Sequence, residues 1–242
     1  MTPRRRADRL LVERGLFASR AQAQAAIAAG RVTADEVIVR RASDEIAVDA
    51  VLSAEPAHPW VSRGGVKLAA ALDRFGFDPS GRVCLDVGAS TGGFCEVLLA
   101  RGARRVYAVD VGRDQLHPKL RRRSEVISFE ATDIRQIDTA HLPAPPSLVV
   151  VDVSFISLKL VLPAALALAS PSAQAVALIK PQFEAGRGLV KKGIVRDPQV
   201  HAFVCDEIAA FLPTLGWTVI DVMPSPIAGG DGNREFLIGA VA

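Results

Sequence analysis

Short apolar runs alternate with longer amphipathic stretches along most of the chain, which is the pattern of an α/β protein. Seven runs predict strands, at 83–87, 106–109, 126–129, 148–153, 175–179, 219–223 and 236–240. Four stretches with apolar positions three or four residues apart predict helices, at 66–75, 93–100, 156–169 and 200–215. Strands and helices that alternate in this way build a doubly wound parallel sheet, whose ligands bind outside the carboxyl ends of the strands.

The first sixty residues show a different pattern, in which two short helices are followed by short strands. Ser19 stands three residues before Gln22, a spacing that caps a helix, and Gly15 and Gly30 end the two helices. Strand candidates lie at 32, 37–39, 46–48 and 51–52. A proline-rich stretch then marks a boundary. We therefore expect a small α+β domain at 1–57, a linker at 58–61 and a larger domain at 62–242.

Composition narrows the class of protein. Half of the 242 residues are hydrophobic, so the chain can bury a sizeable core, and its three cysteines are scattered without metal-ligand spacing. The first residues lack an apolar signal core, and Lys159 and Pro163 interrupt the longest apolar stretch. We expect a cytoplasmic protein with no metal and no membrane partner. The net charge is only +3, but seven arginines fall within the first 31 residues, which favours a phosphate-binding surface.

The segment VCLDVGASTGGF at 83–94 predicts a ligand site. A strand, a glycine-rich turn and a helix form a cradle, because glycines let the backbone approach a ligand and the helix N-terminus presents free N–H groups. The dinucleotide fingerprint and a phosphate-binding lysine are missing, so we expect a nucleoside without a pyrophosphate, and S-adenosylmethionine fits. Asp110 ends the next strand, where a carboxylate binds ribose hydroxyls. The other predicted cofactor residues of this segment are Asp86, Gly88, Ser90, Thr91, Gly92, Gly93 and Phe94.

Charged residues at the predicted carboxyl ends of the strands are the candidates for chemistry. Asp152 interrupts the apolar run at the end of the fourth strand, and Lys180 follows the fifth. Lys67 opens a helix, and Glu235 begins the last strand. A buried charge needs a partner, so the two lysines and two carboxylates could neutralise one another. The chain has six lysines against twenty-three arginines, and lysine is the cation that can lose its proton when buried. These lysines are therefore expected to serve proton transfer.

Five motifs resemble those of the TlyA-type ribosomal RNA 2′-O-methyltransferases, also called the haemolysin A family: SRGGVKL, LDVGASTGGF, VDVSFISL, KPQFEAGRG and GNREF. The N-terminal stretch RADRLLVERGLFASRAQAQAAIAAGRV resembles the alpha-L RNA-binding domain named after ribosomal protein S-four. The resemblance covers nearly the whole chain. It implies a class I, Rossmann-like, FtsJ-class methyltransferase domain with a seven-stranded sheet, preceded by a small RNA-binding domain.

The resemblance also implies an activity and its residues. The family's Lys-Asp-Lys-Glu tetrad falls on Lys67, Asp152, Lys180 and Glu235, and Asp133 would accept a hydrogen bond from adenine. The implied reaction is S-adenosylmethionine-dependent methylation of a cytidine ribose in ribosomal RNA, and either lysine could take the hydroxyl proton. The large subunit is favoured because the chain ends a few residues after the last strand, while the small subunit stays open. A monomer is expected. The implied RNA contacts are Arg5, Arg6, Arg9, Arg20, Arg31 and Arg63.

Two other functions are alternatives. The haemolysin name suggests a pore-forming protein, although the expected absence of a signal and a spanning segment argues against one. A non-catalytic RNA-binding or ribosome-assembly factor could keep the same fold, although such a protein would have no reason to retain both lysines. Mapping of 2′-O-methylation in ribosomal RNA with and without the protein separates the methyltransferase from these two alternatives.

Overall fold

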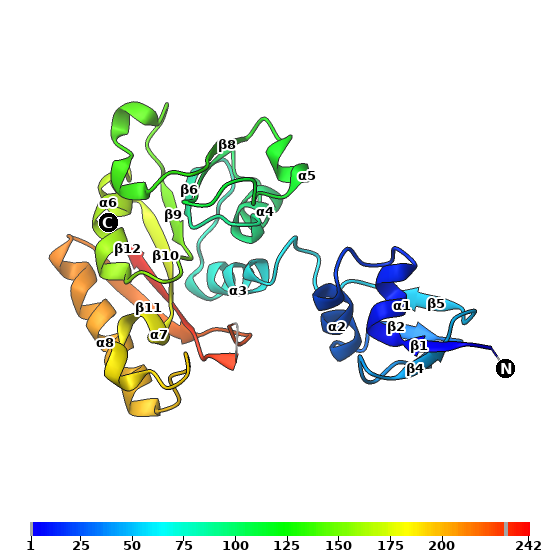
Figure 1. Ribbon diagram of the computed structural model, residues 1–242. Coiled ribbons are helices and arrows are strands. Elements are labelled where there is room, and N and C mark those ends of the chain that lie inside the picture. Colours follow the sequence, from blue (N-terminus) through cyan, green and yellow to red (C-terminus); the bar gives the residue numbers. More distant parts are fainter. Residues whose placement is uncertain (1, 230–231) are drawn as a thin grey trace. The chain divides into compact units, whose positions relative to one another are not determined.

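The computed structural model describes residues 2–229 and 232–242, and these residues form two compact units. The first unit is Met1–Pro59 and the second is Trp60–Ala242 (Figure 1). The sequence-based domain limits, with a linker at 58–61, stay a prediction. No helix among the described residues is both long enough and apolar enough to cross a membrane.

The first unit packs two helices against short strands. Ser19 caps the second helix by accepting a hydrogen bond from the backbone N–H of Gln22 at 3.3 Å, at the predicted position. Leu11 and Ala23 of the two helices are fully buried, together with Val32 of a strand. The elements are β1 (Arg4–Arg6), α1 (Ala7–Glu13), α2 (Arg20–Ala28), β2 (Val32–Ala34), β3 (Val37–Ile38), β4 (Glu45–Ala47) and β5 (Leu52–Ala54).

Strand β1 was not predicted from the sequence. Its three consecutive arginines carry no apolar alternation, yet they pair antiparallel with β4, with Arg5 opposite Ile46. The pairing is made by backbone groups, which leaves the arginine side chains exposed or half-buried. The arginines near the N-terminus are therefore held on a small sheet.

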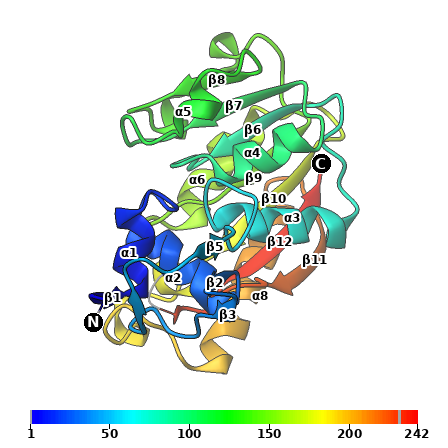
Figure 2. The same cartoon turned by 90° about the vertical axis from the view of Figure 1, so that its right-hand side faces the viewer.

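The second unit is built on a seven-stranded sheet whose order is β11-β12-β10-β9-β6-β7-β8 (Figure 2). The strands are β6 (Val83–Val87), β7 (Arg105–Val109), β8 (Val126–Phe129), β9 (Leu148–Val151), β10 (Gln174–Ile179), β11 (Thr218–Pro224) and β12 (Phe236–Val241). The α-helices are α3 (Gly64–Phe75), α4 (Gly93–Ala100), α5 (Pro118–Arg121), α6 (Leu158–Ala167), α7 (Pro181–Glu184) and α8 (Pro198–Thr214). Short 3₁₀ turns are η1 (Ile134–Gln136), η2 (Thr139–His141) and η3 (Arg187–Leu189).

Apolar cores cover both faces of this sheet, which is why its central strands are almost entirely apolar. Leu68 of α3 and Leu98 of α4 pack on one face, against the side chains of alternate strand residues such as Cys84. Leu162 of α6 and Ile208 of α8 pack on the other face. With both faces covered, the ends of the strands are where a ligand can reach the sheet.

The sheet is mixed, which corrects the expectation of an all-parallel sheet. Strand β12 lies between β10 and β11 and runs antiparallel to both, with Phe236 opposite Ile179. Local apolar pattern does not encode the direction in which a strand pairs. Because of this reversal, the start of β12 lies at the same end of the sheet as the carboxyl end of β10.

Candidate active site

Two ion pairs lie at the carboxyl end of the sheet. Lys67 of α3 pairs through Nζ with Oε2 of Glu235, which directly precedes β12, and the two side chains are only 10% and 3% exposed. Lys180, directly after β10, places Nζ 2.6 Å from Oδ1 of Asp152, which follows β9. The structure thus brings together the four charged residues singled out in the sequence. Their near-burial makes each charge dependent on its partner.

Lys180 contacts two oxygens. Its Nζ donates a hydrogen bond of 2.9 Å to Oγ of Ser154, and it forms an ion pair with Oδ1 of Asp152. Its side chain is 10% exposed and that of Asp152 is 21% exposed. The amine is therefore held in place while remaining open to a small molecule.

A pocket of about 270 Å³ gives access to this cluster. Lys67, Asp152 and Lys180 line it, and Glu235 supports Lys67 from behind. Arg63 also lines this pocket, and the remaining lining comes from the glycine-rich segment and its neighbours. Those further residues are Ser62, Gly64, Gly88, Ala89, Ser90, Thr91, Gly93, Phe94 and Ser154.

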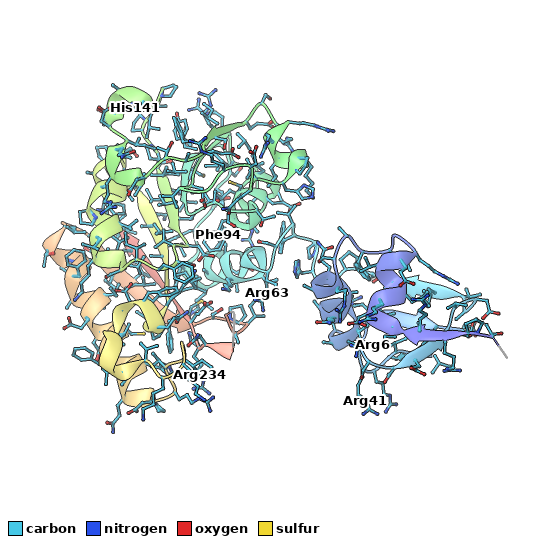
Figure 3. The ribbon with its side chains drawn as sticks, in the orientation of Figure 1. Arg6, Arg41, Arg63, Phe94, His141 and Arg234 are labelled. Carbon is cyan, nitrogen blue, oxygen red and sulfur yellow. The ribbon has the colours of Figure 1, made fainter. Side chains whose placement is uncertain are left out.

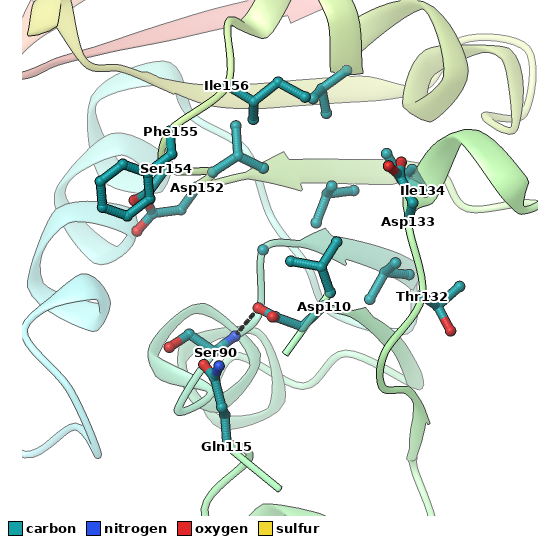
Figure 4. A pocket seen from close by; sticks show the side chains of 16 residues that line it. Ser90, Asp110, Gln115, Thr132, Asp133, Ile134, Asp152, Ser154, Phe155 and Ile156 are labelled. Carbon is teal, nitrogen blue, oxygen red and sulfur yellow. Dashed lines mark hydrogen bonds between the residues drawn. The ribbon is translucent and has the colours of Figure 1, made fainter. Parts of the chain in front are cut away.

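A second pocket of about 360 Å³ adjoins the first (Figure 4). The two pockets share Gly88, Ser90, Asp152 and Ser154 in their walls. A molecule in the second pocket can therefore meet a molecule in the first beside Asp152. This is the arrangement that a group transfer between two bound molecules requires.

Asp110 and Asp133 line the second pocket, as the cofactor prediction requires (Figure 4). Oδ2 of Asp110 accepts the backbone N–H of Ser90, and Oδ1 accepts that of Gly112, each at 2.7 Å. These bonds fix the carboxylate and leave lone pairs for a ligand hydroxyl. The neighbouring Arg135 guanidinium holds the pKa of Asp133 below its usual range, so that carboxylate stays an acceptor.

Gly88 explains why the cradle needs glycine. Its φ is +84°, and a Cβ at this position would overlap the backbone carbonyl of Asp152. The ends of β6 and β9 can therefore approach closely only with glycine here. This close approach is what places Asp152 at the junction of the two pockets.

Two predicted cofactor residues line neither pocket. Gly92 lies against Leu116 and Leu120, and Asp86 is fully buried within β6. Neither carboxylate oxygen of Asp86 has a hydrogen-bond partner in the part of the chain that the structure describes. Burial raises the pKa of Asp86 to about 7, an effect that the nearby thiol of Cys95 only partly offsets.

The structure adds pocket residues that the sequence analysis did not single out. Phe155 is 90% exposed with a φ of +65°, and its ring centroid lies 5.0 Å from that of Phe183. Ser154, which holds Lys180, and Gln115 also line the second pocket. An exposed aromatic in a conformation that is rare outside glycine is a signal of function rather than of packing. The motif VDVSFISL contains Phe155, but its exposure and backbone conformation are visible only in the structure.

The predicted RNA-binding arginines of the first unit differ in their surroundings. Arg20 and Arg6 both donate hydrogen bonds to the buried carboxylate of Asp8. The bond from Nη2 of Arg20 is 2.7 Å long, and that from Nε of Arg6 (Figure 3) is 3.1 Å long. Arg31 pairs with Glu55 at 3.1 Å, and Arg5 pairs with Glu13 at 3.3 Å.

Arg9 is exposed and forms no ion pair with any residue that the structure describes. Arg20, by contrast, stabilises its own unit through its ion pair with Asp8. Arg9 is the better probe of RNA contact, because its replacement breaks no ion pair within the unit.

Comparison with known proteins decides the family. The profile described as FtsJ-like methyltransferase matches residues 60–241, and that described as S4 domain matches residues 5–52. The chain belongs to the FtsJ-like methyltransferases. The predicted family, fold class and enzyme class are thereby confirmed, with an S4 domain preceding the methyltransferase domain.

Relatives match this FtsJ-like methyltransferase over most or all of its length. The Mycobacterium tuberculosis 16S/23S rRNA (cytidine-2′-O)-methyltransferase TlyA is 46% identical over 98% of this chain and 90% of its own length. The Campylobacter jejuni 23S rRNA (cytidine-2′-O)-methyltransferase TlyA is 36% identical over 73% of this chain and 69% of its own. A solved Streptococcus thermophilus protein described as a candidate hemolysin matches with TM-score 0.78 and 40% identity, over 100% and 89% of the two chains.

Proposed function

We propose that this protein transfers a methyl group from S-adenosylmethionine to the ribose 2′-oxygen of a cytidine in ribosomal RNA. The observation that carries the proposal is the junction of the two pockets, where Asp152 and Lys180 meet the glycine-rich segment. We infer the nucleotide, cytidine, and the class of RNA from the relatives that are named as rRNA (cytidine-2′-O)-methyltransferases.

The larger pocket fits a nucleoside cofactor. Asp110 offers a fixed carboxylate to ribose hydroxyls, and Asp133 offers an acceptor to the amino group of adenine. Gly88 allows the close backbone approach between β6 and β9 that forms the floor. When bound, S-adenosylmethionine supplies an electrophilic methyl group on a sulfonium sulfur.

The smaller pocket fits the acceptor ribose. Lys180, held by Ser154 and Asp152, is the group that we assign to take the proton of the 2′-hydroxyl. The 2′-oxygen then forms its bond to the methyl carbon as the carbon–sulfur bond breaks, and the proton stays on Lys180. Lys180 must first release its own proton to solvent through the open side of the pocket, because an ammonium has no lone pair, and the ammonium that forms again in the transfer pairs with Asp152. Lys67, neutralised by Glu235, faces the same pocket and positions the ribose.

The first unit is proposed to bind folded ribosomal RNA through phosphates, and Arg63 to contact RNA at the acceptor pocket. We favour a large-subunit cytidine as the main target, because both TlyA relatives are named as methyltransferases of 23S rRNA. The proposed partners are therefore ribosomal RNA and the ribosomal subunit, encountered in the cytoplasm.

Isolated ribosomal subunits test the substrate. The purified full chain should transfer labelled methyl groups from S-adenosylmethionine to large subunits, with much lower transfer to small subunits. Arg9→Gln should raise KM for the subunit, because a phosphate contact is lost. It should leave kcat unchanged, because the substitution breaks no ion pair among the described residues of the first unit. Transfer to small subunits that matches or exceeds transfer to large ones would show the choice of target to be wrong.

A further inference from the structure

A third pocket lies in the second unit, with a volume of about 400 Å³. It shares no lining residue with the two pockets of the active site. Arg196 and Arg234 line it, together with Val195, Pro198 and His201. Both arginines are exposed, and Figure 3 shows Arg234 at the periphery of its unit. Two guanidinium groups at one pocket suit an anion with several oxygens.

Asn233 joins the two chain segments that bring these arginines together. Its Oδ1 accepts the backbone N–H of Val195 at 3.2 Å, and its Nδ2 donates to the carbonyl of Gly193 at 2.9 Å. The side chain is only 3% exposed. His201 bonds the carbonyl of Val195 through Nε2 at 3.0 Å, which fixes the same segment from α8. These bonds fix the backbone beside Arg196 and Arg234 without any contribution from a ligand.

No carboxylate lines this pocket in the part of the chain that the structure describes. The neighbouring Asp197 is the N-cap of α8 and uses Oδ1 to accept the N–H of Gln199 at 2.9 Å. Neither Arg196 nor Arg234 forms an ion pair with another described residue. Among the residues that the structure describes, no carboxylate therefore offsets the positive charge of these two arginines.

The pocket is coupled to the active site through the chain. Arg234 directly precedes Glu235, and the side chains of residues 233, 234 and 235 are buried, exposed and buried in turn. Arg234 therefore points outward from the segment whose next residue points inward to Lys67. An anion bound between the two arginines would lie on the segment that carries Glu235, the partner of Lys67.

We propose that Arg196 and Arg234 form a phosphate subsite that binds one phosphodiester of the RNA strand carrying the acceptor ribose. The inference rests on the proposed function and gives the methyltransferase domain an RNA contact of its own, apart from the S4 domain. RNA is favoured over other anions because the substrate strand must pass this end of the sheet to reach Lys180. The subsite positions the strand and takes no part in proton transfer.

The test compares two double variants of the full chain. Arg196→Gln with Arg234→Gln removes the subsite, and Arg104→Gln with Arg122→Gln removes the same charge before the amino ends of β7 and β8. Binding of purified large ribosomal subunits is measured over a series of salt concentrations, with S-adenosylhomocysteine affinity as a second readout. The subsite variant should bind at least about tenfold more weakly. Its salt slope should fall by roughly 0.7 to 0.9 per lost contact.

The control pair should keep the wild-type affinity and salt slope, and both variants should bind S-adenosylhomocysteine as the wild type does. Arg196→Lys with Arg234→Lys should retain most of the salt slope, because the charge remains. An unchanged affinity and slope in the glutamine variant would overturn the subsite, as would an equal loss in the control pair. Failure of the wild type to methylate ribosomal RNA would instead refute the proposed function and leave the binding result standing.

Discussion

Lys67 and Glu235 are 168 residues apart in the chain and form a buried ion pair at the carboxyl end of the sheet. The antiparallel direction of β12 makes this possible, because a parallel last strand would begin at the opposite end. Gly229 completes the site, since a Cβ there would overlap the carboxylate of Glu235. The topology of one strand thus determines whether the tetrad can assemble.

The first prediction concerns the energy of this pair. Lys67→Met or Glu235→Leu alone should lower the free energy of unfolding by about 3–5 kcal/mol, because each leaves a buried charge without its partner. The double variant should regain most of that loss while remaining inactive. Chemical denaturation of the four proteins measures the coupling.

The exposed pair between Arg74 of α3 and Asp221 of β11 is the matched control, with side chains 62% and 36% exposed. Its coupling should be about 0–1 kcal/mol. If the losses at Lys67 and Glu235 were simply additive, the two residues would not depend on each other.

Asp110 tests the cofactor pocket. Asp110→Ala should weaken binding of S-adenosylhomocysteine by roughly 1–3 kcal/mol, because ribose hydroxyls lose a charged acceptor. Isothermal calorimetry gives the dissociation constant directly. Asp78→Ala, which removes an exposed carboxylate bonded to the N–H of Ser80, is the control and should bind as the wild type does. An unchanged constant for Asp110→Ala would remove this residue from the cofactor site.

Asp8 should control the acid stability of the S4 domain. Bonds from Arg6, Arg20 and Gln24 hold the pKa of this buried carboxyl well below its usual range. A depressed pKa stabilises the fold above the unfolded value of about 3.9, and this contribution is lost as the pH falls below it.

The protection factors of the α1 amides, which correct for the effect of pH on intrinsic exchange, should therefore fall below about pH 4 in the wild type. In Asp8→Asn the protection should be lower already at pH 7 and less dependent on acid. Glu13→Gln, at an exposed pair with Arg5, is the control and should change little. Equal protection in Asp8→Asn and the wild type at pH 7 would contradict the account.

Asp86 should make the stability of the fold depend on pH in the opposite direction. With a folded pKa of about 7 and an unfolded one near 3.9, this carboxyl binds its proton more tightly in the folded state. Stability should therefore fall as the pH rises from about 4 to about 7, by up to about 1.4 kcal/mol per pH unit. Asp86→Asn should remove that slope in denaturation curves of the second unit. A slope that survives the substitution must come from another group.

Much of the methyltransferase fold could be predicted because its strands are buried on both faces and appear as apolar runs. The end of each run also located Asp152 and Lys180, since a charge after a buried strand lies at the end of the sheet. The direction of β12 could not be predicted, because antiparallel and parallel partners of a buried strand have the same apolar pattern. Strand β1 escaped prediction because its three consecutive arginines show no alternation of apolar and polar residues.

Long-range partners were also beyond prediction from the sequence. The carboxylate of Asp8 bonds Arg20 from twelve residues away, so an arginine predicted to bind RNA also stabilises its own domain. Asp86 precedes the glycines as a cofactor residue would, yet the pleat of β6 turns it into the core. In both cases the packing of neighbouring elements, absent from the local pattern, determines the role of the side chain.

The central claim is that Lys180 takes the proton of a ribose 2′-hydroxyl in ribosomal RNA. The most direct measurement is mass spectrometry of nucleosides from large subunits treated with S-adenosylmethionine and the wild type, Lys180→Ala or Lys180→Arg. The wild type should yield 2′-O-methylcytidine. Both variants should yield almost none while binding S-adenosylhomocysteine normally, because alanine has no base and arginine keeps its proton. A methyl group on a base, or substantial 2′-O-methylcytidine from either variant, would contradict the account.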